Sequence, residues 1–325
     1  MWTRLLCLAA VAFLTATSGP AFGADPAAYP NRPIHIIISF PAGTATDTLA
    51  RVVGQKLESA LGQPVIIDIR TGAAGNNGLA AAARSAPDGY TLTIGGAAMC
   101  INVSIYGEHA VNPLRDFTPV AKLATSPIII VANPSAHIDT IADLIARARR
   151  DPGRLAYSTP GVGTPTHVAA ELLAALADVT MLHIPYAGSG QLMTDVLSGN
   201  VPLSFALPGA TQQFVSSGQL RAVAVTGPHR IAAMPDVPTV AESGYPGFDV
   251  TSWHSILAPA GTPPEIVERL NHELVRIIAM PDVRERLTAI GMDPSPSSPA
   301  QLAAEIRTEV ARWGPIVQRA GIHLH

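Results

Sequence analysis

The sequence has little charge, few aromatic residues and only two cysteines. Charged residues make up 14% of the 325 residues, aromatic residues 5%, and the formal net charge is −3. This charge balance argues against a nucleic-acid partner, which selects a basic surface. Apolar residues nevertheless make up 48%, which excludes a disordered chain and predicts a globular protein with a large core.

The N-terminal segment predicts export. Arg4 precedes an apolar run over residues 5–16, and Ala21-Phe22-Gly23 supplies the small residues of a cleavage site before Ala24. The run is too short for a membrane span. Cleavage would leave Cys100 as a single cysteine, which cannot form an internal disulfide. We therefore expect a periplasmic protein, cleaved near Gly23/Ala24, in which Cys100 is a buried small residue rather than a nucleophile.

Common enzyme signatures are missing from the sequence. It contains no G-x-S-x-G and no G-x-x-x-x-G-K-[ST], and the glycine spacing over residues 72–78 differs from that of a dinucleotide-binding loop. His167 and Glu171 are one helical turn apart, but a third metal ligand is missing. We expect no catalytic residue, no metal and no cofactor. Two alternatives stay open: a periplasmic hydrolase that uses His167 or Asp47, and a ligand-free scaffold or signalling adaptor.

Strand and helix patterns alternate along the chain after Ala24. The expected strands lie at 34–40, 65–69, 90–94, 155–159, 181–185, 201–207, 220–226 and 253–258. This alternation predicts an α/β fold with mostly parallel sheets flanked by helices. The length favours two lobes. After a signal peptide at 1–23, we place lobe 1 at 24–124 plus 249–325 and lobe 2 at 125–248, with Ser126-Pro127 breaking the chain where it crosses.

Two strand–loop–helix joints, one in each half, are the most informative feature. The first is Pro41-Ala42-Gly43-Thr44-Ala45-Thr46-Asp47 before a helix from Thr48, and the second is Pro160-Gly161-Val162-Gly163-Thr164-Pro165 before a helix from Thr166. Helix N-termini carry unpaired N–H groups and a partial positive charge, so each joint predicts an anion site that uses neither lysine nor arginine. We expect Thr46 or Asp47 to cap the first helix and the two joints to be similar in plan only.

Together the two joints predict a ligand cleft between the lobes. Glycines allow the backbone to approach a ligand closely, and threonine and serine hydroxyls both donate and accept hydrogen bonds. Tyr186 follows another expected strand and is placed to line the same cleft. In open α/β sheets, ligands bind beyond the carboxyl ends of the strands.

Ten segments of the sequence resemble the Bug-type extracytoplasmic solute receptors, the binding proteins of tripartite tricarboxylate transporters. These segments are Tyr29–Ile34, Phe40–Gly43 with Asp47, Leu61–Val65, Gly75-Asn76, Ala86–Leu92, Pro185-Tyr186, Leu220–Thr226, Pro235–Thr239, Ser252-Trp253 and Ala258–Pro263. The resemblance implies a two-lobed periplasmic binding protein fold, type II-like, that closes on a small carboxylate like a Venus flytrap. It also implies delivery to the membrane permease subunits of the transporter or to a sensor kinase, and we expect a monomer.

The resemblance further implies which residues hold the ligand. In that family one loop of each lobe grips the proximal carboxylate, and by position these loops are Phe40–Asp47 and Ser158–His167 here. Asn76 and Tyr186 would complete the cleft. The expected ligand-binding residues are therefore Phe40, Ala42, Gly43, Thr44, Thr46, Asp47, Asn76, Ser158, Thr159, Gly161, Gly163, Thr164, His167, Tyr186 and Ala206.

The chain departs from the family pattern most clearly in the expected strand 201–207. Relatives often carry acidic residues where Pro202 and Ala206 stand here. A buried acid at such a position would pair with an amine of the ligand. Its replacement predicts a di- or tricarboxylate or an aromatic acid as the ligand, rather than an amino acid.

Overall fold

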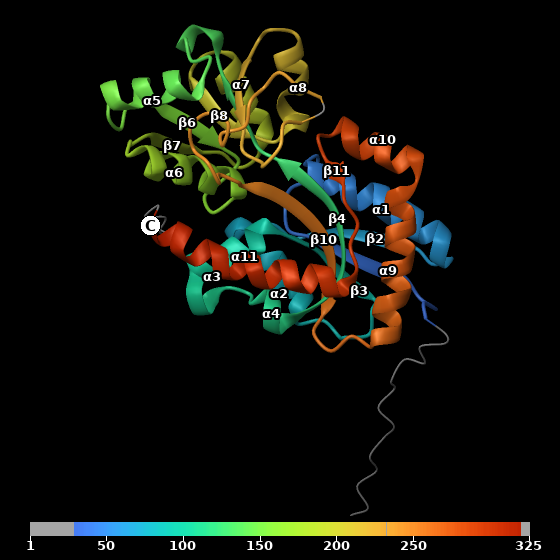
Figure 1. Ribbon diagram of the computed structural model, residues 1–325. Helices are drawn as coiled ribbons and strands as arrows, with labels where there is room; N and C mark the ends of the chain where they lie inside the picture. The colour runs from blue at the N-terminus through green and yellow to red at the C-terminus, as the bar shows by residue number, and fades with distance from the viewer. Residues whose placement is uncertain (1–28, 232, 320–325) are drawn as a thin grey trace, which may run out of the picture.

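The computed structural model describes residues 29–231 and 233–319, which form two α/β lobes (Figure 1). Lobe 1 surrounds a six-stranded sheet of order β11-β4-β10-β3-β1-β2, and lobe 2 surrounds a five-stranded sheet of order β7-β6-β8-β5-β9. The two-lobed α/β architecture is confirmed, whereas the predicted signal peptide lies outside the described residues. Within the described ranges, no helix is both long and apolar enough to cross a membrane.

Lobe 1 combines residues from both ends of the described chain. Its strands are β1 (Ile34–Ile38), β2 (Val65–Ile69), β3 (Thr91–Gly96), β4 (Phe117–Pro127), β10 (Thr251–Pro259) and β11 (Asp293–Pro294). Its helices are α1 (Ala45–Leu61), α2 (Asn76–Ala83), α3 (Ala97–Tyr106), α4 (Pro113–Asp116), α9 (Pro264–Ala279), α10 (Pro281–Ala289) and α11 (Pro299–Arg319). Single-turn 3-10 helices lie at Ala73–Gly75 and Gly107–His109. Both faces of β1 are covered, so its isoleucines are buried on each side.

Lobe 2 is formed by the middle of the chain. Its strands are β5 (Ile129–Ala132), β6 (Ala156–Thr159), β7 (Leu182–Pro185), β8 (Leu203–Ala206) and β9 (Arg221–Val225). Its helices are α5 (Ile141–Arg150), α6 (Pro165–Ala177), α7 (Ser189–Leu197) and α8 (Pro208–Ser216), with a 3-10 turn at Pro134–Ala136. In both lobes the predicted strands exist, and their ends shift by one or two residues in most cases.

Each sheet is mixed rather than mostly parallel. Strands β1, β2 and β3 run parallel, as do β6, β7 and β8. The strands that connect the lobes run the other way: β10 is antiparallel to β3 and β4, and β5 is antiparallel to β8 and β9. The prediction from βαβ alternation therefore holds only where a helix separates consecutive strands, because a chain that crosses between lobes enters the sheet in the opposite direction.

The crossing at Ser126-Pro127 differs from the expected break. These residues belong to β4, an 11-residue strand that ends only at Pro127. Pro127 pairs at the end of the antiparallel ladder with Thr251, where a missing N–H is tolerated. Lobe 2 begins directly afterwards with β5, so one almost continuous extended segment passes through both lobes.

Thr226 joins the two crossing segments at the point where they pass each other. Its Oγ1 donates to the Val250 carbonyl oxygen at 2.6 Å and lies 3.3 Å from the backbone nitrogen of Ile128. The Thr226 N–H donates to the Ile128 carbonyl, and the Val250 N–H donates to the Thr226 carbonyl. Thr226 is fully buried. Residues 128, 226 and 250 thus form the connection between the lobes, here called the hinge.

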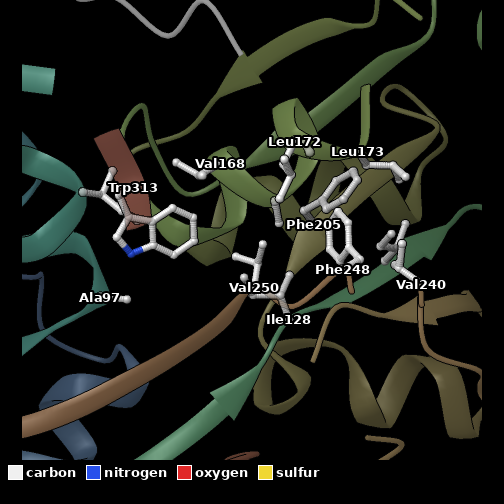
Figure 2. Packing of buried hydrophobic residues seen from close by; sticks show 14 of the residues in the cluster. Ala97, Ile128, Val168, Leu172, Leu173, Phe205, Val240, Phe248, Val250 and Trp313 are labelled. Atoms are coloured by element: carbon white, nitrogen blue, oxygen red, sulfur yellow. The ribbon is translucent and has the colours of Figure 1, made fainter. Parts of the chain in front are cut away.

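One hydrophobic cluster is continuous across this hinge (Figure 2). Trp313 of α11 and Ala97 of α3 lie at one end and Leu173 and Val240 at the other, with Ile128, Val250 and Phe205 between them. The carboxylate of Glu309, also on α11, accepts hydrogen bonds from the indole N–H groups of Trp313 (2.8 Å) and Trp253 (3.5 Å). The helix α11 therefore packs on lobe 1 next to the hinge and contacts α6 of lobe 2.

Candidate functional site

A cavity of about 280 Å³ lies between the two lobes. Lobe 1 contributes residues 39–41, 43–46 and 48, residues 74, 75 and 79, the end of β3 with the start of α3, residues 252–254 of β10, and Ile290. Lobe 2 contributes the segments that precede α6 and α7 and the start of α8. The strands β1 and β3 point their carboxyl ends at this space, which is where ligands bind in open α/β sheets.

The lobe 1 loop, residues 39–44, ends in a tightly bonded helix start. Gly43 has φ +79°, a left-handed conformation that glycine adopts without strain. Its N–H donates to Asp47 Oδ2 at 2.9 Å, and the hydroxyl of Thr44 donates to the Pro41 carbonyl at 2.8 Å. The same Thr44 Oγ1 accepts the N–H of Asp47 at 3.4 Å. Thr44 therefore caps α1, which corrects the prediction of Thr46 or Asp47 as the cap.

The lobe 2 loop, residues 160–164, repeats this geometry. Gly163 has φ +76°, and its N–H donates to His167 Nδ1 at 3.2 Å. The hydroxyl of Thr164 donates to the Gly161 carbonyl at 2.7 Å and accepts the N–H of His167 at 3.4 Å. Thr164 is the N-cap of α6, so this helix begins at Pro165 rather than at the predicted Thr166.

The two loops share a sequence pattern as well as a conformation. Gly43-Thr44-Ala45-Thr46 and Gly163-Thr164-Pro165-Thr166 both read Gly-Thr-x-Thr. The expectation that the joints are similar in plan only is therefore wrong. The repeat is visible in the sequence. Each copy is only four residues long and carries no charged group, so it resembles an ordinary tight turn.

This repeated pattern leaves backbone donors free at the cavity. By helix geometry the first N–H groups of a helix have no intrahelical partner, and here these belong to Ala45, Thr46 and Thr166. Pro165 has no N–H to offer. All four residues line the cavity. Two helix N-termini thus face one enclosed space and make it favourable for a negative charge.

The residue after each Gly-Thr-x-Thr pattern differs between the lobes. In lobe 1 it is Asp47, whose Oδ1 accepts from Arg51 Nε at 2.8 Å. In lobe 2 it is His167, which is 6% exposed and stacks on His183 with ring centroids 4.0 Å apart. Burial, assisted by the neighbouring His183, lowers the pKa of His167 to about 3. His167 is therefore neutral, and Nδ1 is the acceptor for Gly163.

A buried polar cluster surrounds His167. Burial lowers the pKa of His183 to about 4, and its Nε2 lies 2.7 Å from Thr159 Oγ1. Glu171 Oε1 lies 3.9 Å from His167 Nε2 and accepts a hydrogen bond from the Tyr157 hydroxyl. Burial raises the pKa of Glu171. The cluster supports the lobe 2 loop from behind and is separate from the cavity wall.

The cavity wall carries no formal charge among the described residues. It contains neither lysine, arginine, aspartate nor glutamate, and His254 is its one ionisable side chain there. Burial lowers the pKa of His254 to about 4, which keeps it neutral. His254 Nε2 and Ser39 Oγ are both buried and without a hydrogen-bond partner in the described part of the chain. An unpaired buried polar atom is unfavourable, so both atoms mark a place where a ligand or water would supply a partner.

Five of the predicted site residues line the cavity: Phe40, Gly43, Thr44, Thr46 and Thr164. The other ten lie outside its wall: Ala42, Asp47, Asn76, Ser158, Thr159, Gly161, Gly163, His167, Tyr186 and Ala206. Most of these ten support the two loops or the strands beneath them. Their direct contact with a ligand stays a prediction.

The polar groups of three of these outer residues are bonded within the protein. The side chain of Asn76 donates to the His109 carbonyl and accepts the N–H of Val111. The Tyr186 hydroxyl donates to Asp195 Oδ2 at 2.7 Å, and the Ser158 hydroxyl donates to the Leu203 carbonyl at 3.3 Å. The side chains of Asn76, Ser158 and Tyr186 thus hold loops and strands in place.

Several residues that line the cavity were not predicted from the sequence. They come from five separate segments, and all except His254 are apolar or lack a side chain: Leu79, Ile94, Gly95, Gly96, Met99, Leu207, Gly209, Trp253, His254 and Ile290. The Ser252-Trp253 pair was noticed only as part of the family resemblance. No local pattern separates these residues from ordinary core residues, because only the folded arrangement brings them to one space.

The lobes touch on two sides of the cavity. On one side, a Cβ at Gly209 of α8 would lie 2.1 Å from the carbonyl oxygen of Ile290, which follows α10 of lobe 1. On the other, a Cβ at Gly163 would lie 3.2 Å from Ile105 Cδ1 and 3.6 Å from Ala74 Cβ, both in lobe 1. Glycine at these positions lets the lobes meet, so this is a closed arrangement.

The described residues contain no group of three or more His, Cys, Asp or Glu side chains that could hold a metal ion. The His167 and Glu171 pair therefore has no third ligand of these types in the described part of the chain. Cys100 is fully buried and unpaired, as predicted, and burial raises the pKa of its thiol.

Comparison with known proteins identifies the family. Residues 49–322 match the model of the tripartite tricarboxylate transporter family receptor. The protein BugT of Bordetella pertussis is 36% identical over 324 residues, which covers 99% of each chain. The chain belongs to this receptor family, and the resemblance to Bug-type receptors is confirmed.

Solved structures show the same fold. A structure described as R. palustris Rpa4515 with adipate superposes with a TM-score of 0.84 at 33% identity, covering 91% of this chain and 99% of the other. MatC from Rhodopseudomonas palustris, with bound malate, gives a TM-score of 0.81 at 30% identity, covering 89% of this chain and all of the other. A third neighbour, the periplasmic binding protein BugD, gives 0.82 at 31% identity, covering 91% of this chain and 99% of the other. Periplasmic localisation follows from the family.

Proposed function

We propose that this receptor captures one small organic carboxylate in the cavity between its lobes and presents it to the membrane permease of a tripartite tricarboxylate-type transporter or to a sensor kinase. The observation that carries the proposal is the pair of Gly-Thr-x-Thr loops, which aim two helix N-termini into one cavity. Related structures with adipate and malate support a carboxylate as the anion.

Binding works by a shift between open and closed states. Lobes that we divide at 24–124 plus 249–325 and at 125–248 rotate about the hinge at residues 128, 226 and 250. An anion gains the donors of both loops only when the lobes meet, so its binding favours the closed arrangement. The permease or kinase then distinguishes the closed form from the open one.

The proposed ligand has no amine. A buried ammonium group requires a carboxylate partner, and the described wall of the cavity offers none. Ala206, which carries no charge, lies at the end of β8 directly before Leu207 of this wall. This supports the preference for di- or tricarboxylates and aromatic acids over amino acids.

We propose that the protein has no catalytic activity. The rival hydrolase would need His167 or Asp47 at the bound carboxylate. His167 uses Nδ1 to hold Gly163, and Asp47 holds Gly43 and Arg51, so both are engaged within the loops. Incubation with each bound carboxylate followed by mass spectrometry tests this point, and the appearance of a product would support the hydrolase.

The function is tested by ligand titration of the purified mature protein. We expect a subset of small carboxylates, screened by thermal shift and then by calorimetry, to raise the melting temperature and to bind with one site per chain. Amides of the same acids serve as controls and should not bind, because they lack the charge. If no carboxylate shifts the melting temperature, the scaffold or adaptor alternative gains support.

Export and oligomeric state complete the proposal. We propose cleavage near Gly23/Ala24, without a retained cofactor or metal, and a monomeric mature protein. Mass spectrometry of the protein recovered from the periplasm would give the first residue, and light scattering its mass in solution.

A further inference from the structure

Glu309, on the helix α11, is a buried carboxylate that the proposed function has not yet used. In the described part of the chain only two acidic residues are buried, Asp47 and Glu309. Asp47 holds the lobe 1 loop, whereas Glu309 lies outside the cavity wall. A buried charge is unfavourable unless it is paired and hydrogen-bonded, so the partners of Glu309 indicate what it supports.

These partners are two indoles and one guanidinium group. Oε2 of Glu309 accepts the Nε1–H of Trp313 at 2.8 Å and that of Trp253 at 3.5 Å. Oε1 accepts from Arg312 at 3.1 Å, and Arg312 also donates to the carbonyl oxygen of Asp249, which lies next to the hinge. One carboxylate on α11 therefore connects this helix to β10 and, through Arg312, to the chain segment at the hinge.

Trp253 is the partner that lines the cavity. Its backbone lies against the end of β3, where a Cβ at Gly96 would be 2.3 Å from the Trp253 carbonyl oxygen. Gly96 also lines the cavity and is the N-cap residue of α3. Trp253 is thus held on two sides, by Gly96 at its backbone and by Glu309 at its indole. A displaced Trp253 would change the wall at the start of α3.

We propose that Glu309 is a positioning residue for ligand binding, which fixes Trp253 and through it the wall formed by β10 and the start of α3. This inference rests on the proposed function and adds to it a residue that does not touch the ligand. Arg312 balances the charge of the carboxylate. Loss of the acceptor would leave two buried indole N–H groups unpaired, which favours a displaced Trp253.

Glu309 also stabilises the fold, so its effect on binding has to be separated from its effect on folding. Trp313 makes this possible. It is fully buried, donates to the same oxygen as Trp253 and does not line the cavity. Removing the Trp313 hydrogen bond should therefore lower the free energy of unfolding alone, whereas removing the Trp253 hydrogen bond should also weaken binding.

A double-mutant cycle on the full-length mature protein tests the proposal. Calorimetry uses whichever of adipate, malate, citrate and benzoate binds the wild type most tightly, and urea unfolding measures stability. We expect Trp253→Phe and Glu309→Leu each to weaken binding about tenfold. The double variant should stay within about threefold of the weaker single variant, because Glu309 acts through Trp253.

Three further variants complete the experiment. Trp313→Phe should lose stability and keep its affinity within about threefold of the wild type. Glu309→Gln retains an oxygen that accepts an indole N–H and should bind more tightly than Glu309→Leu. Glu305→Gln is the matched control, because Glu305 lies one turn earlier on α11, pairs with Lys122 at 2.8 Å and is outside the cavity wall. Its affinity should equal that of the wild type.

The outcomes separate this proposal from the function on which it rests. Additive losses of affinity in the double variant, or equal losses in Trp253→Phe and Trp313→Phe, would overturn the positioning role while the receptor function stands. The second comparison holds even if Glu309→Leu fails to fold. If the wild type binds none of the four acids, the receptor function itself is contradicted, and the role of Glu309 in binding falls with it.

Discussion

The two loops at the cavity have the same backbone conformation, but different side chains hold them in place. Each begins a helix with Gly-Thr-x-Thr, and the glycine N–H is held by the side chain four residues later. In lobe 1 that side chain is the carboxylate of Asp47, paired with the half-exposed Arg51. In lobe 2 it is the neutral imidazole of His167, buried against His183. The same loop geometry is thus held in place by two different kinds of side chain.

The difference shows what such a loop requires. An acceptor is needed at the fourth position after the glycine, and its charge is secondary. A carboxylate near the bound anion is acceptable in lobe 1 because Arg51 compensates it. Lobe 2 needs no such compensation, because a neutral histidine adds no charge near the anion. Its support is instead sensitive to acid.

The largest effect is expected when the two loops are kept from meeting. In Gly209→Ala the new Cβ would lie 2.1 Å from the Ile290 carbonyl oxygen, a clash with backbone that only separation of the lobes relieves. Alanine also favours a helix over glycine by about 1 kcal/mol, so lobe 2 itself should stay folded. We expect the best-binding carboxylate to lose more than about 1,000-fold in affinity by calorimetry, equivalent to about 4 kcal/mol.

Gly190→Ala is the matched control for this experiment. Gly190 is the second residue of α7, as Gly209 is of α8, and its Cβ would meet no described atom within 4 Å. Its affinity should equal that of the wild type. Wild-type affinity in Gly209→Ala would contradict closure as the step that joins the two loops.

The two loop glycines should differ when each is replaced by valine. Gly43 and Gly163 share a positive φ, so both variants strain the backbone by about 1–2 kcal/mol. Of the two introduced valines, only the one at position 163 would also clash with Ile105 of the opposite lobe. We expect Gly163→Val to weaken binding about 100-fold and Gly43→Val about tenfold, measured by calorimetry.

Thermal unfolding of the two valine variants distinguishes binding from folding. Both should lose a similar amount of stability in the absence of ligand, because the shared strain acts on the loop itself. Equal losses of affinity would show that Gly163 has no special role between the lobes.

Substitutions of His167 can remove or retain the side-chain atom that accepts the N–H of Gly163 in lobe 2. His167→Leu leaves the N–H of Gly163 unpaired, which costs about 1–3 kcal/mol, and we expect carboxylate affinity to fall at least about tenfold. His167→Asn offers an oxygen in place of Nδ1 and should stay within about threefold of the wild type. Asp47→Asn, which also keeps the acceptor, should behave like His167→Asn. A larger loss in His167→Asn than in His167→Leu would show that the ring, rather than the acceptor, supports the loop.

Acid should weaken the support of the lobe 2 loop. The pKa of His167 is lowered in the folded state to about 3 and that of His183 to about 4, so the unfolded chain binds more protons at mildly acidic pH. Their contribution to stability is complete above the unfolded pKa of about 6.5 and is lost as the pH falls toward the folded values. The raised pKa of Glu171 acts in the opposite direction.

Urea unfolding at pH 7 and pH 5.5 measures this dependence. The wild type should be less stable at pH 5.5, and His167→Asn should lose less, with the two differing by about 1 kcal/mol. That is about a fivefold change in the folding equilibrium. Identical pH dependence in both proteins would mean that His167 does not titrate on unfolding.

Much of the fold was predictable because its signals are local. Strands such as β2, at Val65–Ile69, are short runs rich in β-branched residues whose bounds follow from their neighbours. The helix α1 ends at Gly62, whose φ of +69° suits glycine. The predicted break at Ser126-Pro127 lies at the end of β4, which continues through both residues because a proline is tolerated at the end of an antiparallel ladder.

The sequence by itself determined the two loops that we propose bind the anion. A strand end, a left-handed glycine and a threonine cap are encoded within a few residues, so both loops form their geometry from local interactions. Only the tertiary structure decided the rest. It turned Asn76, Tyr186 and His167 to internal partners, and it brought Met99, Leu207 and Trp253 to one wall. Those contacts depend on strand pairing and lobe closure between residues far apart in the chain, and no local pattern specifies them.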